Sequence, residues 1–169
     1  METQNNIFFI SLGCAKNLVD SEHMLGLLIS EGYDLAMDVD EAGIAVINTC
    51  GFIQASVEEA IATILEMADL RKKGELKKLI VAGCFVQRYG YKLRKEIPEV
   101  DGWLGTGDVH RIAEVIGDDA GLLFLFISAD LSTWQTIAFQ GFRQRPFTVR
   151  SYGLPKDVHI GVPTALSPA

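Results

Sequence analysis

The residues of this sequence best suited to chemistry are three cysteines, Cys14, Cys50 and Cys84, each of which closely follows a strand-like apolar run. Continuous apolar runs of this length are typical of buried parallel strands. In a parallel sheet, ligands gather outside the carboxyl ends of the strands. We therefore expect the three thiols at one edge of the same sheet, where a glycine beside each of them lets the backbone approach a bulky ligand.

These three thiols could hold an iron–sulfur cluster, because cluster irons favour thiolate ligands. Three thiolates on a four-iron cluster would leave one iron open to a substrate or a sulfur donor, just as catalytic zinc sites keep one position free. The alternative is that they are ordinary buried cysteines, since this residue type is often buried and the long spacings form no compact Cys-x-x-Cys signature. Zinc is a weaker competitor, because no histidine lies beside the strand ends.

Strand-like and helix-like segments alternate from residue 7 to about residue 116. The strands are expected at residues 7–12, 44–47, 79–82 and 102–105. The segments between them carry apolar residues at helical spacing. Asn17 is expected to cap the first helix and Gly32 to stop it, and Ser56 and Glu59 are spaced as a capping box for the second. This alternation predicts an α/β fold, with a parallel sheet of about four strands flanked by helices.

The character of the sequence changes past Ile116. Residues 117–169 hold four of the five prolines and scattered aromatic residues that follow neither a strand period nor a helix period. We therefore expect a domain over residues 1–116 and an irregular tail over residues 117–169.

Composition excludes several classes of function. The net charge of −7 argues against a nucleic-acid grip, which needs a basic face. The longest apolar stretch, residues 121–129, is too short to span a bilayer, and the polar N-terminus does not resemble a signal peptide. Three cysteines cannot all pair as disulfides, and a reducing compartment would keep them as thiols. A cytoplasmic location is the expectation.

The segments around the cysteines carry a family resemblance. They read SLGCAKNLVDSE over residues 11–22, NTCGFI over residues 48–53 and AGCFVQRY over residues 82–89, and IPEVD and GTGD follow in order. In these motifs the sequence resembles the methylthiotransferases, in their RimO-like form. Ala15-Lys16 favours that form over the relatives that modify tRNA, which typically have Gln-Met there. The resemblance covers residues 7 to about 116.

The resemblance implies an auxiliary 4Fe-4S cluster held by Cys14, Cys50 and Cys84. It also implies that a complete enzyme adds a barrel that uses S-adenosylmethionine, with a second cluster on Cys-x-x-x-Cys-x-x-Cys, and a C-terminal substrate-binding domain. RimO-like enzymes place a methylthio group on an aspartate of a small-subunit ribosomal protein, and the open iron is thought to hold the sulfur. The implied partners are that ribosomal protein and a sulfur donor.

Five polar residues fall in the same motifs: Asn17, Asp20, Ser21, Asn48 and Gln87. Helix capping and loop hydrogen bonding are their expected roles, and tuning of the cluster is the alternative.

The motif of the second cluster is not found in this sequence, and no cysteine follows Cys84. We therefore expect a truncated chain with no catalytic residues of its own, inactive alone. An offset reading frame can be built by joining the third base of each residue's codon to the first two bases of the next codon. Between Pro155 and Ala165 the offset codons permit Glu-Gly-Cys-x-x-Arg-Cys-x-Tyr-Cys, which matches the missing motif. A one-base frame slip between about residues 116 and 126 would explain this. The nucleotide sequence across residues 110–169 tests the hypothesis, and stop codons closing the offset frame just past Ala169 would contradict it.

Three other readings stay open. The chain could be a non-catalytic iron–sulfur or sulfur-carrier module, a relative of the tRNA methylthiotransferases, or an inert fragment whose cysteines are merely thiols.

Overall fold

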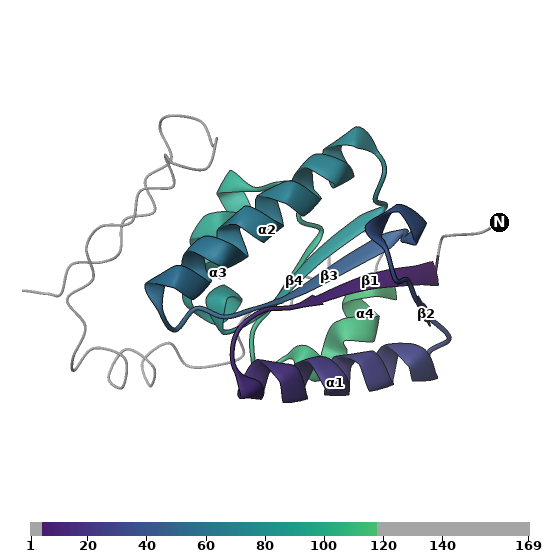
Figure 1. The fold of residues 1–169 in the computed structure, drawn as a ribbon, viewed down its shortest axis with the longest axis horizontal. Coiled ribbons are helices and arrows are strands. Elements are labelled where there is room, and N and C mark those ends of the chain that lie inside the picture. The colour runs from purple at the N-terminus through teal and green to yellow at the C-terminus, as the bar shows by residue number, and fades with distance from the viewer. Residues whose placement is uncertain (1–4, 118–169) are drawn as a thin grey trace, which may run out of the picture. The chain divides into compact units, whose positions relative to one another are not determined.

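A computed structural model describes residues 5–117 of the chain (Figure 1). The expected tail, but for its first residue, lies outside the described residues. Strands and helices alternate in the order β1 (Asn6–Ser11), α1 (Ala15–Ser30), β2 (Asp34–Leu35), η2 (Val39–Glu41), β3 (Ile44–Thr49), α2 (Gln54–Lys73), β4 (Lys78–Gly83), α3 (Cys84–Glu96), β5 (Gly102–Leu104), η3 (Val109–Arg111) and α4 (Ile112–Gly117). Within this part of the chain, no helix is both long and apolar enough to cross a membrane.

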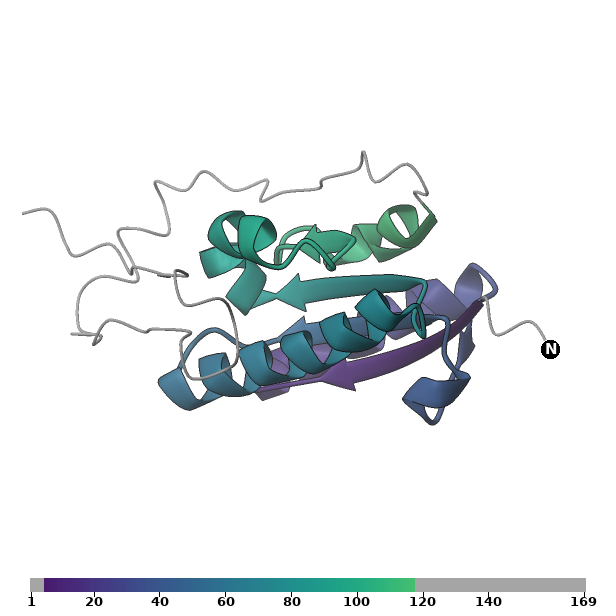
Figure 2. The same ribbon diagram turned by 90° about the horizontal axis from the view of Figure 1, so that it is seen from above.

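The sheet is parallel throughout, and its strands lie in the order β2-β1-β3-β4-β5. The arrowheads of β1 and β4 point the same way in Figure 2. The predicted α/β fold is confirmed, with one strand more than the expected four. The chain runs from β1 outward to β2 and then returns to place β3 on the other side of β1. Strand order therefore reverses between β1 and β3, and such a reversal opens a crevice at the carboxyl ends of the strands.

Helices cover both faces of the sheet. Helices α1 and α4 pack on one face with Ile7, Val46 and Ile80 beneath them, and α2 and α3 lie on the other (Figure 1). All six residues of β3 are buried, because its alternate side chains enter the two cores in turn. This double burial fixes β3 as the centre of the sheet and sets the register of its neighbours.

The helix ends correct part of the local prediction. Gly32 is confirmed as the stop of α1: its φ is +87°, and its N–H bonds to the carbonyl of Ile29. The predicted caps are wrong, because both helices begin earlier. Cys14 is the N-cap of α1, so Asn17 lies inside the first turn, and α2 begins at Gln54, two residues before Ser56.

Candidate functional site

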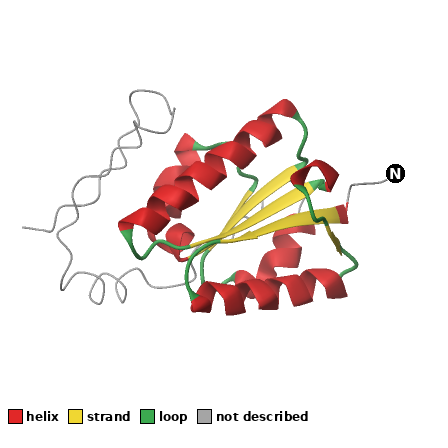
Figure 3. Cartoon of the chain, in the orientation of Figure 1, coloured by secondary structure: helices red, strands yellow, loops and turns green. Residues whose placement is uncertain are grey.

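The three cysteines lie at the carboxyl edge of the sheet, on three neighbouring strands. Cys14 follows β1 as the N-cap of α1, Cys50 follows β3, and Cys84 opens α3 directly after β4. The loops that carry them leave the sheet at the same end (Figure 3). Cys14 and Cys50 thus flank the point where strand order reverses, which is where open α/β sheets bind ligands. The predicted shared edge is confirmed.

The loop after β1 presses directly on Cys50. Gly13 has φ +101°, and a Cβ built there would clash with the Cβ of Cys50 and lie 3.1 Å from its Sγ. The N–H of Leu12 bonds to the carbonyl of Asn48 at 2.8 Å, which continues the pairing of β1 with β3 into the loop. Glycine is required at position 13 for its conformation and for its lack of a side chain.

Cys84 contacts the segment that carries Cys50. The N–H of Gly51 donates to the Sγ of Cys84 at 3.0 Å, and that Sγ lies 3.5 Å from the carbonyl oxygen of Thr49. Burial raises the pKa of the Cys84 thiol, the Gly51 N–H opposes the rise, and the neighbouring Cys50 and Cys14 thiols add to it. Each of the three thiols therefore lies within electrostatic reach of at least one other.

Cys14 differs from the other two because it is exposed, whereas Cys50 is buried and Cys84 half-buried. The backbone N–H groups of Asn17 and Lys16 at the start of α1 lower the pKa of the Cys14 thiol, and the Lys16 ammonium adds a smaller effect. Helix N-termini favour thiolates in this way.

We expect Cys14 to be the first cysteine to react with iodoacetamide in the metal-free chain. Its lowered pKa gives more thiolate at a given pH, so its rate should reach a plateau at lower pH than the rate of Cys84, whose pKa is raised. Near pH 8 Cys14 should therefore be labelled faster than Cys84, because a lower pKa leaves a larger fraction of the thiol as thiolate. Mass spectrometry of labelled peptides measures both rates. In urea the two rates should converge, and equal rates in the folded chain would contradict the prediction.

Within residues 5–117, no three His, Cys, Asp or Glu side chains are gathered at the spacing that holds a single metal ion. Zinc ligands must converge on one point. The ligands of a four-iron cluster surround a larger group and need not meet at a single atom, because each thiolate binds a different iron. The assignment of Cys14, Cys50 and Cys84 as cluster ligands thus stays a prediction.

A buried polar network ties the Cys14 segment to the Cys50 strand. The Nδ2 of Asn48 donates to the carbonyl of Asn17 at 2.8 Å and to the Oγ of Ser21 at 2.9 Å. The Nδ2 of Asn17 donates to the carbonyl of Leu12 at 2.8 Å, and Ser21 also bonds to Ser11. The predicted loop hydrogen bonding is confirmed for Asn17, which bonds to Leu12 in the loop after β1. Ser21 and Asn48 instead join helix α1 to strands β1 and β3, and all three side chains are buried.

One acceptor in this network has no hydrogen-bond partner. The Oδ1 of Asn48 is buried and unpaired, and a Cβ built on Gly83 would lie 2.5 Å from it. The remaining two motif residues lie elsewhere: Asp20 pairs with Lys16 on the surface, and Gln87 lies against Gly105.

Two features of this edge were missed from the sequence. Arg88 bonds through its Nη1 to the carbonyl of Gly51 at 3.1 Å, and its place four residues after Cys84 was the available signal. Exposed apolar side chains also adjoin the cysteines in the chain: Leu18, Val19, Phe52 and Ile53.

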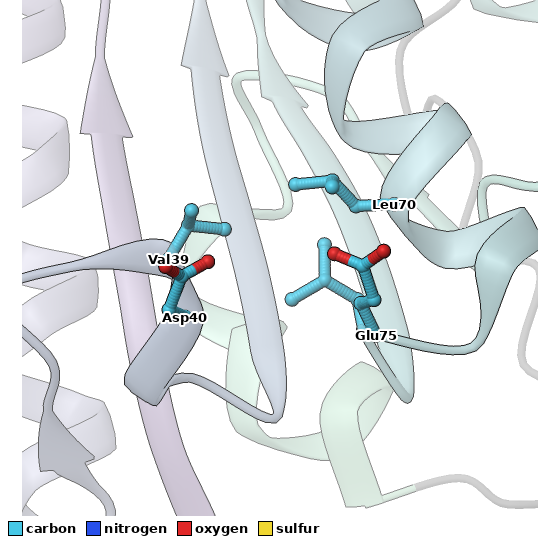
Figure 4. Close-up of a pocket in the computed structure, with 5 residues that line it drawn as sticks. Val39, Asp40, Leu70 and Glu75 are labelled. Atoms are coloured by element: carbon cyan, nitrogen blue, oxygen red, sulfur yellow. The ribbon is translucent and has the colours of Figure 1, made fainter.

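A hollow of about 230 Å³ lies at the opposite, amino edge of the sheet (Figure 4). Its lining comes from η2 and from the end of α2 with the loop that follows: Val39, Asp40, Leu70, Glu75 and Leu76. It contains no thiol and lies beyond the other end of β3 and β4, so it takes no part in the cysteine site.

Comparison with known proteins covers the same part of the chain. The model of the family described as "Uncharacterized protein family UPF0004" matches residues 6–105. The chain is 48% identical over 115 residues to "Ribosomal protein uS12 methylthiotransferase RimO" of Trichlorobacter lovleyi, which is 68% of this chain and 26% of the relative. It is 59% identical over 110 residues to the protein of that name from Lachnoclostridium phytofermentans, covering 65% of this chain and 25% of the relative. The chain spans about a quarter of the length of the curated relatives it matches.

Proposed function

Since the chain belongs to the family described as uncharacterized protein family UPF0004 and carries a RimO-like methylthiotransferase N-terminal domain, we propose that Cys14, Cys50 and Cys84 hold one 4Fe-4S cluster. The observation that carries this proposal is the position of the three thiols, on adjacent strands at the crevice where strand order reverses.

The residues of this edge fit such a group. Thiolates are the usual protein ligands of cluster irons, and the Gly51 N–H already donates to the Cys84 sulfur, as donors around cluster sulfurs commonly do. Glycines at positions 13, 51 and 83 leave no Cβ where the backbone segments meet. When bound, a cluster with three protein ligands supplies one iron without a protein ligand, at which sulfur can be held.

The chain's own residues act by holding and orienting these ligands. Cys50 is the buried ligand, and the Asn48 network keeps its strand against the first turn of α1. The N-terminus of α1 favours the thiolate of Cys14, the exposed ligand. The site is thus anchored on its buried side and open on its solvent side.

For the whole protein we propose methylthiolation of an aspartate of ribosomal protein uS12, with S-adenosylmethionine and a sulfur donor. The names of the relatives support the methylthiolation of uS12, and this chain matches about a quarter of the length of those relatives. A reducing compartment such as the cytoplasm suits three free thiols.

Anaerobic reconstitution of the 169-residue chain with iron and sulfide tests the cluster. We expect about four iron atoms per chain and a visible absorbance band. Cys50→Ala should lose both, because it removes the buried ligand, while Ser30→Ala, at the far end of α1, should keep both. Circular dichroism confirms that each variant is folded. Absent iron uptake, or uptake undiminished in Cys50→Ala, would refute the cluster, and methylthiolated uS12 formed by this chain alone would refute the need for further domains.

A further inference from the structure

Both backbone polar groups of Gly51 are held by helix α3. Its N–H donates to the Sγ of Cys84 at 3.0 Å, and its carbonyl accepts from the Nη1 of Arg88 at 3.1 Å. Cys84 and Arg88 are four residues apart and so lie on the same side of the helix, one turn from each other. One turn of α3 therefore binds both backbone polar groups of Gly51, which lies in the loop that carries Cys50.

The loop lies flush on α3 at this point. A Cβ on Gly51 would lie 2.7 Å from the Cα of Phe85 and 3.0 Å from its backbone nitrogen. Any other residue would lift the loop away from the helix, because real Cβ atoms do not approach backbone so closely. The spacing between Gly51 and α3 is thus set by backbone contact, and the two hydrogen bonds fix the orientation.

Arg88 is exposed, yet α3 itself restrains its side chain. Its guanidinium carbon lies 5.4 Å from the centre of the Tyr89 ring, a distance at which cation and ring attract each other. Tyr89 in turn packs against Phe85, with ring centres 5.3 Å apart. The side chain that donates to Gly51 is therefore restrained by contacts within α3 as well as by its hydrogen bond to the loop.

We propose that Arg88 is a positioning residue that fixes Gly51 so that its N–H points at the Cys84 sulfur. The consequence for the cluster rests on the function proposed above. Hydrogen bonds to ligand sulfurs stabilise the more negative, reduced cluster and so raise its reduction potential. Arg88 thereby sets the potential of the site without touching a ligand.

Amide hydrogen exchange of Gly51 in the metal-free, full-length chain tests the positioning itself. Arg88→Met removes the donor and should speed Gly51 exchange about fivefold to tenfold, the effect of one ordinary hydrogen bond. Arg88→Gln and Arg88→Lys each keep a donor and should restore part of the protection. Arg111→Met, which removes an arginine paired with Glu114 elsewhere in the domain, is the matched control and should leave Gly51 unchanged. Unchanged exchange in Arg88→Met, or an equal change in Arg111→Met, would overturn the proposal.

The reconstituted chain tests the consequence. Arg88→Met should shift the reduction potential of the cluster to a more negative value, and Arg88→Gln, which is uncharged but keeps a donor, should recover part of that shift. A potential that is the same in Arg88→Gln and Arg88→Met would mean that the charge acts alone, and this would refute the hydrogen-bonding role. If the chain takes up no iron, the proposed function fails, while Gly51 exchange still decides the role of Arg88.

Discussion

Replacement of Gly83 by alanine is expected to destabilise the domain by about 3–5 kcal/mol and to prevent cluster binding. Gly83 has φ +104° and ψ −168°, a conformation that only glycine adopts readily. A Cβ there would clash with the carbonyl oxygen of Thr49 and lie 2.9 Å from its nitrogen. Because these contacts are backbone atoms of the central strand β3, they cannot move aside without breaking the pairing of β3 with β4.

Gly74→Ala is the matched control for this prediction. Gly74 also has a positive φ, +81°, but nothing lies within 4 Å of its would-be Cβ. Its substitution should therefore cost only the backbone strain, about 1 kcal/mol. Urea denaturation of both variants compares their free energies of unfolding. An equal loss in Gly74→Ala and Gly83→Ala would show that the close approach of β3 and β4 contributes nothing.

Replacement of Asn48 by alanine is expected to cost about 2–4 kcal/mol and to lower iron uptake. The side chain is fully buried and donates to the Asn17 carbonyl and the Ser21 hydroxyl. Its removal leaves both acceptors buried without this donor and opens a cavity between α1 and β3. The Cys14 segment should then lose its fixed distance from Cys50, so cluster binding should weaken even where the variant folds.

Asn6→Ala serves as its control, because Asn6 also donates from Nδ2 to a carbonyl, that of Glu41, at 3.2 Å, but at an exposed position. That variant should lose less than about 1 kcal/mol and should keep its iron. Urea denaturation and iron content of reconstituted samples are the measurements. If Asn48→Ala loses stability but its iron content equals that of Asn6→Ala, the hydrogen bonds of Asn48 serve stability alone and do not support the cluster.

Much of the fold could be predicted, because the strands of a parallel sheet are buried on both faces. The first four of the six buried residues of β3 form an uninterrupted apolar run in the sequence, and the other main strands contain similar apolar runs. Strand β2 gave no such signal, since Asp34 and Leu35 are both exposed and pair with β1 at the edge. The capping motifs failed for a related reason: the short loops after β1 and β3 start α1 and α2 before the predicted caps are reached.

The candidate site was also predictable only in part. The carboxyl ends of parallel strands lie at one edge of a sheet. This rule depends only on topology, and it correctly predicted that Cys14, Cys50 and Cys84 lie at the same edge. The contacts of Arg88 with Gly51 and of Asn48 with Asn17 could not be predicted, because each joins residues more than thirty positions apart in sequence through a specific side-chain geometry. Long-range contacts of this kind become visible only when the register of β1, β3 and β4 is known.

The order of the three cysteine-bearing strands also has a consequence for synthesis on the ribosome. Cys14, Cys50 and Cys84 emerge one at a time, and Cys84 reaches the other two only when β4 pairs with β3. Parallel pairing of strands so distant in sequence is slow, and domains generally fold as units as the chain grows. Nascent chains in which β4 has not yet been synthesised therefore present Cys14 and Cys50 without Cys84, as thiols open to oxidation. Under the proposed function, delivery of iron and sulfide would follow folding, because the three thiols come together only when β4 has paired with β3.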